Sequence, residues 1–360
     1  MASESVSGPL SAWSDLVLVG LSHREAKVEV RERLSISPEQ LPSVLQQLRQ
    51  AGSLAGLVIV STCNRLECYA SAKDANVAES LLRAFFIQRC PESAGHIFSR
   101  RGRVAVQHLF RVSSGLDSIV VGEHQILGQT KTAYQQAHQA RHTDKLLNKL
   151  FQAAFAAGKN VRSQTGIAQG ICSCGGAAVA MAEKILSSDT TQHRILLVGA
   201  GKMAETAAQH LLERKGTRLT IANRDSGRGQ ILAAQYGAQA VSLEEGMAAI
   251  GEMDVIIAST SCPHYLVTKE RLAGLVKTRQ GRPLLVIDLG VPRNVDPEAA
   301  QIPGVHLYNI DHLEAVIAET LAKRKGEIQA AEAITETLTG EFCEILSREP
   351  APRVAAPCGV

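Results

Sequence analysis

The chain has 360 residues, 45% of them hydrophobic, which is enough to bury the cores of two or three domains. Its 38 basic and 35 acidic residues give a net charge of only +3, so charge alone does not indicate a partner such as DNA. The eight cysteines form no Cys-x-x-Cys pair and no histidine cluster accompanies them, so we expect neither a disulfide framework nor a bound metal. Because the sequence contains no signal peptide and no apolar run of membrane-spanning length, we expect a cytoplasmic protein that does not bind membranes.

The first predicted elements form a small α/β unit. Strands rich in valine and leucine are expected at residues 16–20 and 57–60, and the helix between them begins after Pro38. Cys63 follows the second strand closely, at a place where a rigid scaffold can present a thiol to a substrate. Arg65 lies two residues further on and can favour the thiolate or hold a carboxylate. This pair predicts covalent catalysis on an acidic acyl group, whereas an isolated cysteine of this kind is more often a packing residue.

A mostly helical region is expected from about residue 78 to 162, with interruptions at Gly115 and Gly122. Within it, His108 shares a helical face with apolar neighbours, a pattern typical of a buried core histidine. The segment 164–170 breaks the helical pattern and predicts a connection between two domains.

The clearest motif in the chain is a strand that leads through a Gly-x-Gly turn into a helix, at residues 195–204. Gly199 permits the tight turn, and Gly201 lets the backbone approach a pyrophosphate placed at the helix N-terminus. Further apolar runs separated by helical stretches predict a doubly wound parallel sheet of the Rossmann type. The residues expected to hold the pyrophosphate are Gly199, Ala200, Gly201, Lys202, Met203 and Ala204.

The end of the next predicted strand, at residues 218–222, bears on the choice of cofactor. An NAD-selective site usually places a carboxylate there to bind the ribose 2′-hydroxyl. Here Asn223 and Arg224 stand at the strand end, and a guanidinium favours the 2′-phosphate of NADPH. We therefore expect these two residues to bind NADPH, while Asp225 keeps NAD open as an alternative.

From Asp311 to about Ser347 the sequence predicts one long amphipathic helix, followed by a flexible tail. Apolar residues recur at alternating steps of three and four, as in the seam of a coiled coil. This seam consists of Ile328, Ala331, Thr335, Leu338, Phe342 and Ile345. The seam would be exposed if unpaired, and the alternative is a helix that packs on its own domain.

Five motifs between residues 16 and 346 are long, ordered and unlike those of other dehydrogenases. They are Gly20-Leu21-Ser22-His23-Arg24, Thr62-Cys63-Asn64-Arg65, the segment 107–129, Gly199-Ala200-Gly201-Lys202-Met203 and Asp288-Leu289-Gly290-Val291-Pro292-Arg293. Together they resemble the glutamyl-tRNA reductase family. The resemblance implies an enzyme that uses NADPH to reduce the glutamyl group of glutamyl-tRNA to glutamate-1-semialdehyde, the first step of tetrapyrrole synthesis by the five-carbon route.

The resemblance also implies roles for individual residues. Cys63 would be the nucleophile that forms a thioester, and His108 would be an activity-critical histidine that acts as acid, base or orienting group. Arg65 would bind the side-chain carboxylate of the glutamyl group, with Glu67 orienting it. The residues expected to shape the glutamyl pocket are Thr62, Asn64, Arg65, Ser118, Glu123, His124, Gln125 and Gln129.

The resemblance divides the chain into three parts. A catalytic and tRNA-recognising domain is expected at residues 1–163, an NADPH-binding domain at 164–310, and a long helix with its tail at 311–360. Since the family usually continues into a helical dimerisation region at this point, we expect a monomer or a weak homodimer. The implied partners are glutamyl-tRNA(Glu) and the downstream glutamate-1-semialdehyde aminomutase.

Two other interpretations fit part of the sequence. The glycine turn with Asn223 and Arg224 resembles the cofactor domain of shikimate-type NADP dehydrogenases, but Lys73 lacks the context of that family's catalytic residues and Cys63 would be unexplained. A non-catalytic tRNA-binding or regulatory relative would keep the fold, but the intact Cys63 and glycine turn disfavour it.

Overall fold

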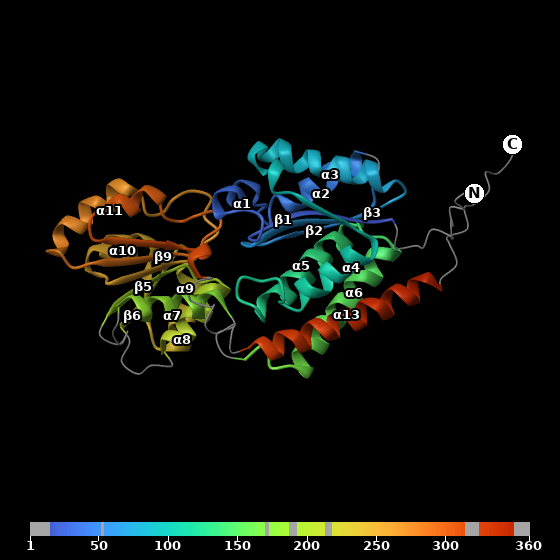
Figure 1. Ribbon diagram of the computed structural model, residues 1–360. Coiled ribbons are helices and arrows are strands. Elements are labelled where there is room, and N and C mark those ends of the chain that lie inside the picture. The colour runs from blue at the N-terminus through green and yellow to red at the C-terminus, as the bar shows by residue number, and fades with distance from the viewer. Residues whose placement is uncertain are drawn as a thin grey trace.

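A computed structural model describes residues 15–51, 54–169, 173–186, 193–212, 218–313 and 324–348 of the protein. Two α/β bodies lie side by side, each built on its own sheet, and a long final helix runs along the first of them (Figure 1). The expected α/β class is confirmed. No helix in the described ranges is long and apolar enough to cross a membrane.

The N-terminal sheet has the strand order β2-β3-β1-β4, and all neighbouring strands are antiparallel. Its strands are β1 (Leu16–Ser22), β2 (Leu54–Ser61), β3 (Arg65–Ala72) and β4 (Phe98–Arg101). The sequence pattern predicts β1 and β2 but not β3, because Arg65 and Glu67 give that strand a polar appearance. It also misses β4, a short edge strand inside the region expected to be helical.

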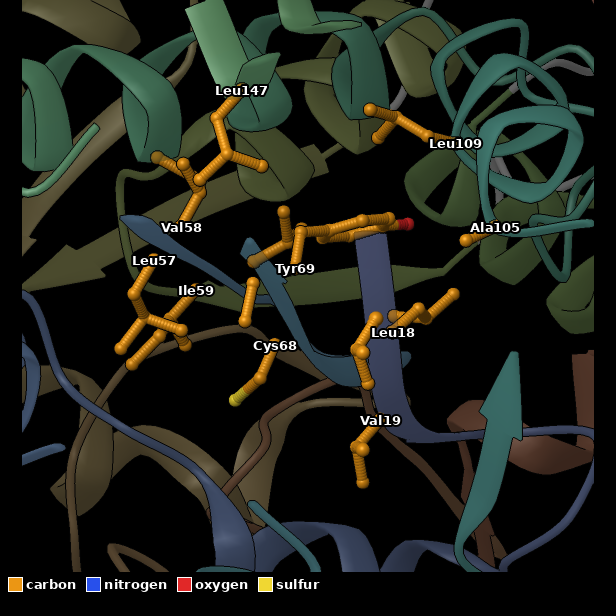
Figure 2. Packing of buried hydrophobic residues seen from close by; sticks show 14 of the residues in the cluster. Leu18, Val19, Leu57, Val58, Ile59, Cys68, Tyr69, Ala105, Leu109 and Leu147 are labelled. Carbon is orange, nitrogen blue, oxygen red and sulfur yellow. The ribbon is translucent and has the colours of Figure 1, made fainter. Parts of the chain in front are cut away.

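Helices cover both faces of this sheet. They are α1 (Val28–Leu34), α2 (Leu41–Gln50), α3 (Ala75–Arg89), α4 (Gly102–Ser113), α5 (Gln125–Gln139) and α6 (Lys145–Gln164), with a short 3-10 turn η1 (Pro91–Gly95). Figure 2 shows Val58 and Tyr69 on the face that meets Leu147, whereas Cys68 and Val19 point to the other face. Because both faces are buried, the central strands have no solvent-facing side.

The second body holds a parallel sheet in the order β10-β9-β8-β5-β6-β7. Its strands are β5 (Arg194–Val198), β6 (Arg218–Asn223), β7 (Gln239–Ser242), β8 (Val255–Ala258), β9 (Leu284–Asp288) and β10 (Val305–Asn309). This is the strand order of the Rossmann fold, so the predicted Rossmann-type sheet is confirmed. The order reverses between β5 and β8, where the carboxyl ends of the strands leave a crevice for a ligand.

The helices of the second body are α7 (Cys174–Leu186), α8 (Lys202–Leu212), α9 (Ser226–Tyr236), α10 (Leu243–Ala248) and α11 (Lys269–Val276). Short 3-10 turns complete it: η3 (Ala249–Glu252), η4 (Lys277–Arg279), η5 (Pro297–Gln301) and η6 (Ile310–His312). α7 packs closely on α8 because Gly175 has no side chain; a Cβ there would overlap the main chain of Met203. All six strands fall within the expected 164–310 domain, whose boundaries stay a prediction.

The final helix, α13 (Lys325–Ser347), packs on α4 and α6 of its own chain (Figure 1). Phe342 is buried and its ring lies 5.8 Å from that of Phe110 on α4. Ile345, by contrast, is 57% exposed and takes no part in this packing. The expectation of a coiled-coil-like seam is therefore wrong and its alternative is correct, because the same apolar spacing serves any neighbouring helix and does not reveal which chain supplies it.

The predicted start of this helix also differs from the structure. Asp311 lies in the short 3-10 helix η6, whereas α13 begins at Lys325. The expected helical residues 314–323 and the expected flexible tail from residue 349 onward lie outside the described residues.

Helix α1 lies beside the second body (Figure 1), and among the described residues three ion pairs join them, including one between Glu29 and Arg293. The Arg31 guanidinium lies 2.8 Å from the Asp311 carboxylate, and the Arg293 guanidinium lies 2.6 Å from that of Glu32. Arg31 is 4% exposed, so water screens its pair with Asp311 only weakly. These contacts link the N-terminal body to the second one.

Candidate active site

Cys63 lies in the tight turn that joins β2 to β3. The Thr62 N–H donates to the Arg65 carbonyl (2.9 Å) and the Asn64 N–H donates to the Thr62 hydroxyl (3.2 Å), which closes the turn. From the other side, Nε of Arg31 donates to the Cys63 carbonyl (3.3 Å). These bonds hold the backbone of Cys63 in place.

The Cys63 thiol stands at the junction of the two bodies. It is half-buried against an apolar cluster that includes Val120 of the N-terminal body and Ala204 of the second body. Burial and then the nearby Glu123 carboxylate raise the pKa of this thiol to about 12, and Arg65 opposes them without offsetting them. Arg65 thus acts in the expected direction, towards the thiolate, but the cost of desolvating the anion is larger.

Arg65 is fully buried in a network of ion pairs. Its Nη1 donates to Glu67 (2.6 Å) and to the Asp117 carboxylate (3.2 Å), and its Nη2 donates to the Asp117 carbonyl. Although burial opposes ionisation, His108 and Arg65 hold the pKa of Glu67 well below its usual range. Of the three guanidinium nitrogens of Arg65, Nε is the one without a hydrogen-bond partner among the described residues. Binding of a substrate carboxylate by Arg65 stays a prediction, with this nitrogen as the free donor.

His108 belongs to the same network. Its Nε2 lies 2.8 Å from Glu67 and its Nδ1 lies 2.6 Å from Nη1 of Arg100. Since arginine can only donate, Nδ1 is the acceptor and the ring proton sits on Nε2, directed at Glu67. The groups that act most strongly on the Cys63 thiol do not include His108. Both ring nitrogens are thus engaged away from the thiol, and the geometry favours the orienting role among those expected for His108.

One group in the described residues has the spacing of metal ligands. Ligand atoms of Glu67, His108 and Asp117 lie within 4.8 Å of one another, and all three residues are buried. The Arg65 guanidinium already bridges the two carboxylates and supplies the positive charge that a cation would bring. We therefore assign no metal to this group.

The loop between α4 and α5 carries two predicted pocket residues, Ser118 and Glu123, which are both buried. Gly115 and Gly122 have positive φ angles of 77° and 85°, and the Gly122 N–H donates to the Gly115 carbonyl (2.9 Å). Nη2 of Arg162 donates to the carbonyl of Glu123 (3.2 Å). This loop has one fixed conformation that directs Glu123 inward.

The remaining predicted pocket residues differ in burial. Gln125 begins α5 and its side-chain nitrogen is buried without a partner in the described part of the chain, as is the side-chain oxygen of Asn64. Buried polar atoms without partners are uncommon and mark places where a polar ligand can bind. His124 and Gln129 are exposed, so the structure does not bring them into the buried part of the site.

The Gly-x-Gly turn follows β5 at the switch point of the parallel sheet. Gly199 has a φ of 111°, and a Cβ there would overlap the carbonyl oxygen of Ser259 beyond β8. Gly201 faces open space, which leaves room for a pyrophosphate to approach the backbone. Lys202 and Met203 begin α8 and Ala204 is buried in its first turn, so the turn fits a dinucleotide as the sequence predicts. Half-buried Ala200 lies between the two glycines.

Asn223 ends β6 and Arg224 follows it, exposed. Asn223 bonds the Asp225 carbonyl (2.8 Å), and Asp225 uses its side chain to cap α9 through the Arg228 N–H (3.1 Å). The Asp225 carboxylate is thereby engaged in the helix cap. The guanidinium of Arg224 forms no ion pair with any described residue.

Two residues of the site escape the sequence reasoning. Asp117 binds Arg65 and also accepts from Nε of Arg24 (2.6 Å), yet it lies 52 residues from Arg65 along the chain. Arg31 holds the Cys63 carbonyl and also pairs with Asp311. Asp117 lies inside the motif 107–129, which is the one signal that could have drawn attention to it. No local sequence pattern shows that Asp117 pairs with Arg65.

Known proteins resemble both bodies of the chain. The family model described as glutamyl-tRNAGlu reductase, N-terminal domain, matches residues 19–165, and the shikimate/quinate 5-dehydrogenase model matches residues 180–316. The glutamyl-tRNA reductase of Pelobacter propionicus is 37% identical over 95% of this chain and 79% of its own length. That of Deinococcus radiodurans is 40% identical over 95% of this chain and 96% of its own length. The solved glutamyl-tRNA reductase from Methanopyrus kandleri is 33% identical, with a TM-score of 0.51, and the match covers 92% of this chain and 80% of that one.

The fold and the site define a two-domain oxidoreductase, in which a cysteine-bearing α/β body faces a Rossmann body that binds a nicotinamide dinucleotide. The glycine turn, with open space beside Gly201, is consistent with that cofactor. The chain belongs to the glutamyl-tRNA reductase family.

Proposed function

We propose that this protein reduces glutamyl-tRNA(Glu) to glutamate-1-semialdehyde with NADPH, by way of a thioester on Cys63. The observation that carries the proposal is the position of Cys63, on a fixed turn at the junction between the two bodies. An acyl group attached there lies between the catalytic body and the carboxyl edge of the cofactor-binding sheet. The cofactor supplies a hydride when bound, and a thioester carbonyl accepts hydride far more readily than a carboxylate does.

We infer that the residues around the thiol bind the glutamyl group. The Asn64 side-chain oxygen, Arg65 Nε and the Gln125 side-chain nitrogen are buried and have no partner in the described part of the chain, and Ser118 hydrogen-bonds Glu123. Thr62 fixes the turn. In this arrangement His108 is a positioning residue that acts through Glu67 and Arg65. Exposed His124 and Gln129 would contact the tRNA end of the substrate.

A direct assay tests the proposal. The full chain is incubated with glutamyl-tRNA(Glu) and NADPH, and the semialdehyde is measured together with the oxidation of the cofactor. We expect one semialdehyde for each NADPH consumed. Oxidation of NADPH without semialdehyde, or no reaction with glutamyl-tRNA, would contradict the proposed function.

We expect NADPH to be preferred over NADH and the preference to depend on Arg224. A guanidinium pairs with the 2′-phosphate that NADH lacks, and Asp225 is engaged in the cap of α9. Arg224→Ala should lower kcat/KM for NADPH by about tenfold, about 1.4 kcal/mol, and leave that for NADH nearly unchanged. Arg228→Ala, which removes a neighbouring exposed arginine, is the matched control. Equal kcat/KM for both cofactors in the unmutated enzyme would show that Arg224 does not select between them.

The division at residues 163/164 and 310/311, the cytoplasmic location, and the monomer or weak homodimer stay predictions from the sequence. We also propose that the product passes to a glutamate-1-semialdehyde aminomutase, because a free aldehyde is reactive and benefits from prompt transfer.

A further inference from the structure

We propose that Glu123 moves the proton of the acyl-transfer step, taking it from the Cys63 thiol and delivering it to the departing ribose oxygen. The inference rests on the proposed thioester and assigns Glu123 a role beyond lining the glutamyl pocket. His108, the histidine of the site, would then take no part in proton transfer.

The position of Glu123 is fixed relative to the thiol turn. Asp117, on the same loop, is bonded to Arg65 of β3, so the loop and the turn form one unit. Gly122 has no room for a side chain, because a Cβ there would overlap the carbonyl oxygen of Ile167. The Glu123 N–H donates to the Val120 carbonyl (3.0 Å), which completes the placement of the residue.

The surroundings of Glu123 keep it able to exchange a proton near neutral pH. Its side chain is 5% exposed and hydrogen-bonds Ser118, and burial raises its pKa to about 7, although Arg65 and Arg162 oppose this. The charged and titratable groups that face it are Cys63 in the turn, Arg65 on β3, Arg162 on α6 and Cys174 on α7, with Arg324 beside the preceding Gly122. Cys63 packs against the apolar cluster that contains Val120, to whose carbonyl the Glu123 N–H donates, and the Glu123 charge raises the pKa of the thiol.

The other candidate bases near the turn are unsuitable. Both ring nitrogens of His108 are engaged, one by Glu67 and one by Arg100. His23 lies beside the turn, where its N–H donates to the Asn64 carbonyl (2.8 Å). Burial and then Arg65 lower the pKa of its imidazole to about 3, so it accepts a proton poorly.

In the proposed step Glu123 accepts one proton and later donates it, so no other acid or base is needed. The Glu123 carboxylate accepts the thiol proton as the sulfur attacks the ester carbonyl and the carbon–sulfur bond forms. The tetrahedral intermediate then collapses, the carbon–oxygen bond to the terminal ribose breaks, and the ribose oxygen takes the proton from the Glu123 carboxyl group. The products are the thioester and free tRNA, and Glu123 is again a carboxylate.

Glu123→Gln tests the proposal through two reactions of the same thiol. Without NADPH, transfer of radiolabelled glutamate from tRNA to the protein measures acyl transfer. Alkylation of Cys63 by iodoacetamide, followed on its peptide by mass spectrometry, measures ionisation of the thiol. Because the Glu123 charge raises the pKa of the thiol, the variant should be alkylated faster, whereas acyl transfer should be slower by about a hundredfold or more.

The pH profile and two further variants complete the test. In the unmutated protein, acyl transfer should rise as the pH increases through about 7, because the carboxylate form of Glu123 is required. The glutamine variant should lose this inflection, and Glu123→Asp, which keeps a carboxylate, should retain it at a lower rate. Glu332→Gln, which removes a carboxylate paired with Arg111 outside the site, is the control.

The outcomes separate this inference from the proposed function. If both reactions of Glu123→Gln become faster, Glu123 only disfavours the thiolate; if both become slower, its role is structural. Either result overturns the proton-transfer role, as does an unchanged pH inflection. If Cys63→Ser still accepts glutamate, the thioester scheme itself fails, whatever Glu123 does.

Discussion

Cys63→Ser is expected to lower the reduction of glutamyl-tRNA by at least about a thousandfold, which corresponds to about 4 kcal/mol in the activation barrier. Serine at this position would have to act as an alkoxide, which is not populated at neutral pH. Even if an acyl-enzyme formed, its oxygen ester would accept hydride more slowly than a thioester. A single-turnover assay with excess enzyme measures the loss directly.

The cofactor site should be unaffected by this substitution, because Cys63 belongs to the N-terminal body and the glycine turn to the second. Titration with NADPH should therefore give an unchanged Kd for Cys63→Ser. Cys343→Ser on α13 makes the same chemical change at a buried cysteine outside the site and should keep normal activity. A serine enzyme within about tenfold of the unmutated rate would rule out the covalent mechanism.

Arg65→Ala is expected to destabilise the protein by about 3–5 kcal/mol, the usual cost of removing one partner from a buried ion pair. The side chain of Arg65 is 1% exposed, and its loss leaves the Glu67 and Asp117 carboxylates buried with less compensation. The free energy of unfolding, measured by urea titration with circular dichroism, should show this loss. Activity should fall as well, because the Arg65 guanidinium bonds Asp117 and so links the β2–β3 turn to the loop between α4 and α5.

Arg24→Ala is the matched control, because Arg24 pairs with the same Asp117 at 2.6 Å but has a side chain that is 50% exposed. Water screens this pair, so its loss should cost less than about 1 kcal/mol. Equal losses in the two variants would contradict the view that burial of the Arg65 network decides its contribution. A small loss in both would mean that the two carboxylates find other partners.

The cofactor turn and the buried parallel strands could be predicted from the sequence, because each depends on residues that are adjacent in the chain. Gly199 and Gly201 predict the cofactor turn, since only glycine allows both the positive φ and the close approach of a pyrophosphate. Apolar runs predict the strands β5, β8 and β9, which are buried on both faces.

The partners of buried charges could not be predicted in this way. Arg65 and Glu67 look like solvent-facing residues, and only the fold brings Asp117 and His108 to them, so β3 is missed as a strand. In the same way, the apolar spacing of α13 fits a coiled coil or a neighbouring helix of the same chain equally well.

The sequence by itself therefore determined the chemistry that the chain carries: a thiol after a strand, a dinucleotide turn and an arginine at the end of β6. Only the tertiary structure decided how that chemistry is tuned. It raises the pKa of the Cys63 thiol through burial and the Glu123 charge, and it engages His108 with Glu67 and Arg100. The physical reason is that desolvation and charge pairing depend on residues that are distant in the chain and meet only when both bodies are folded.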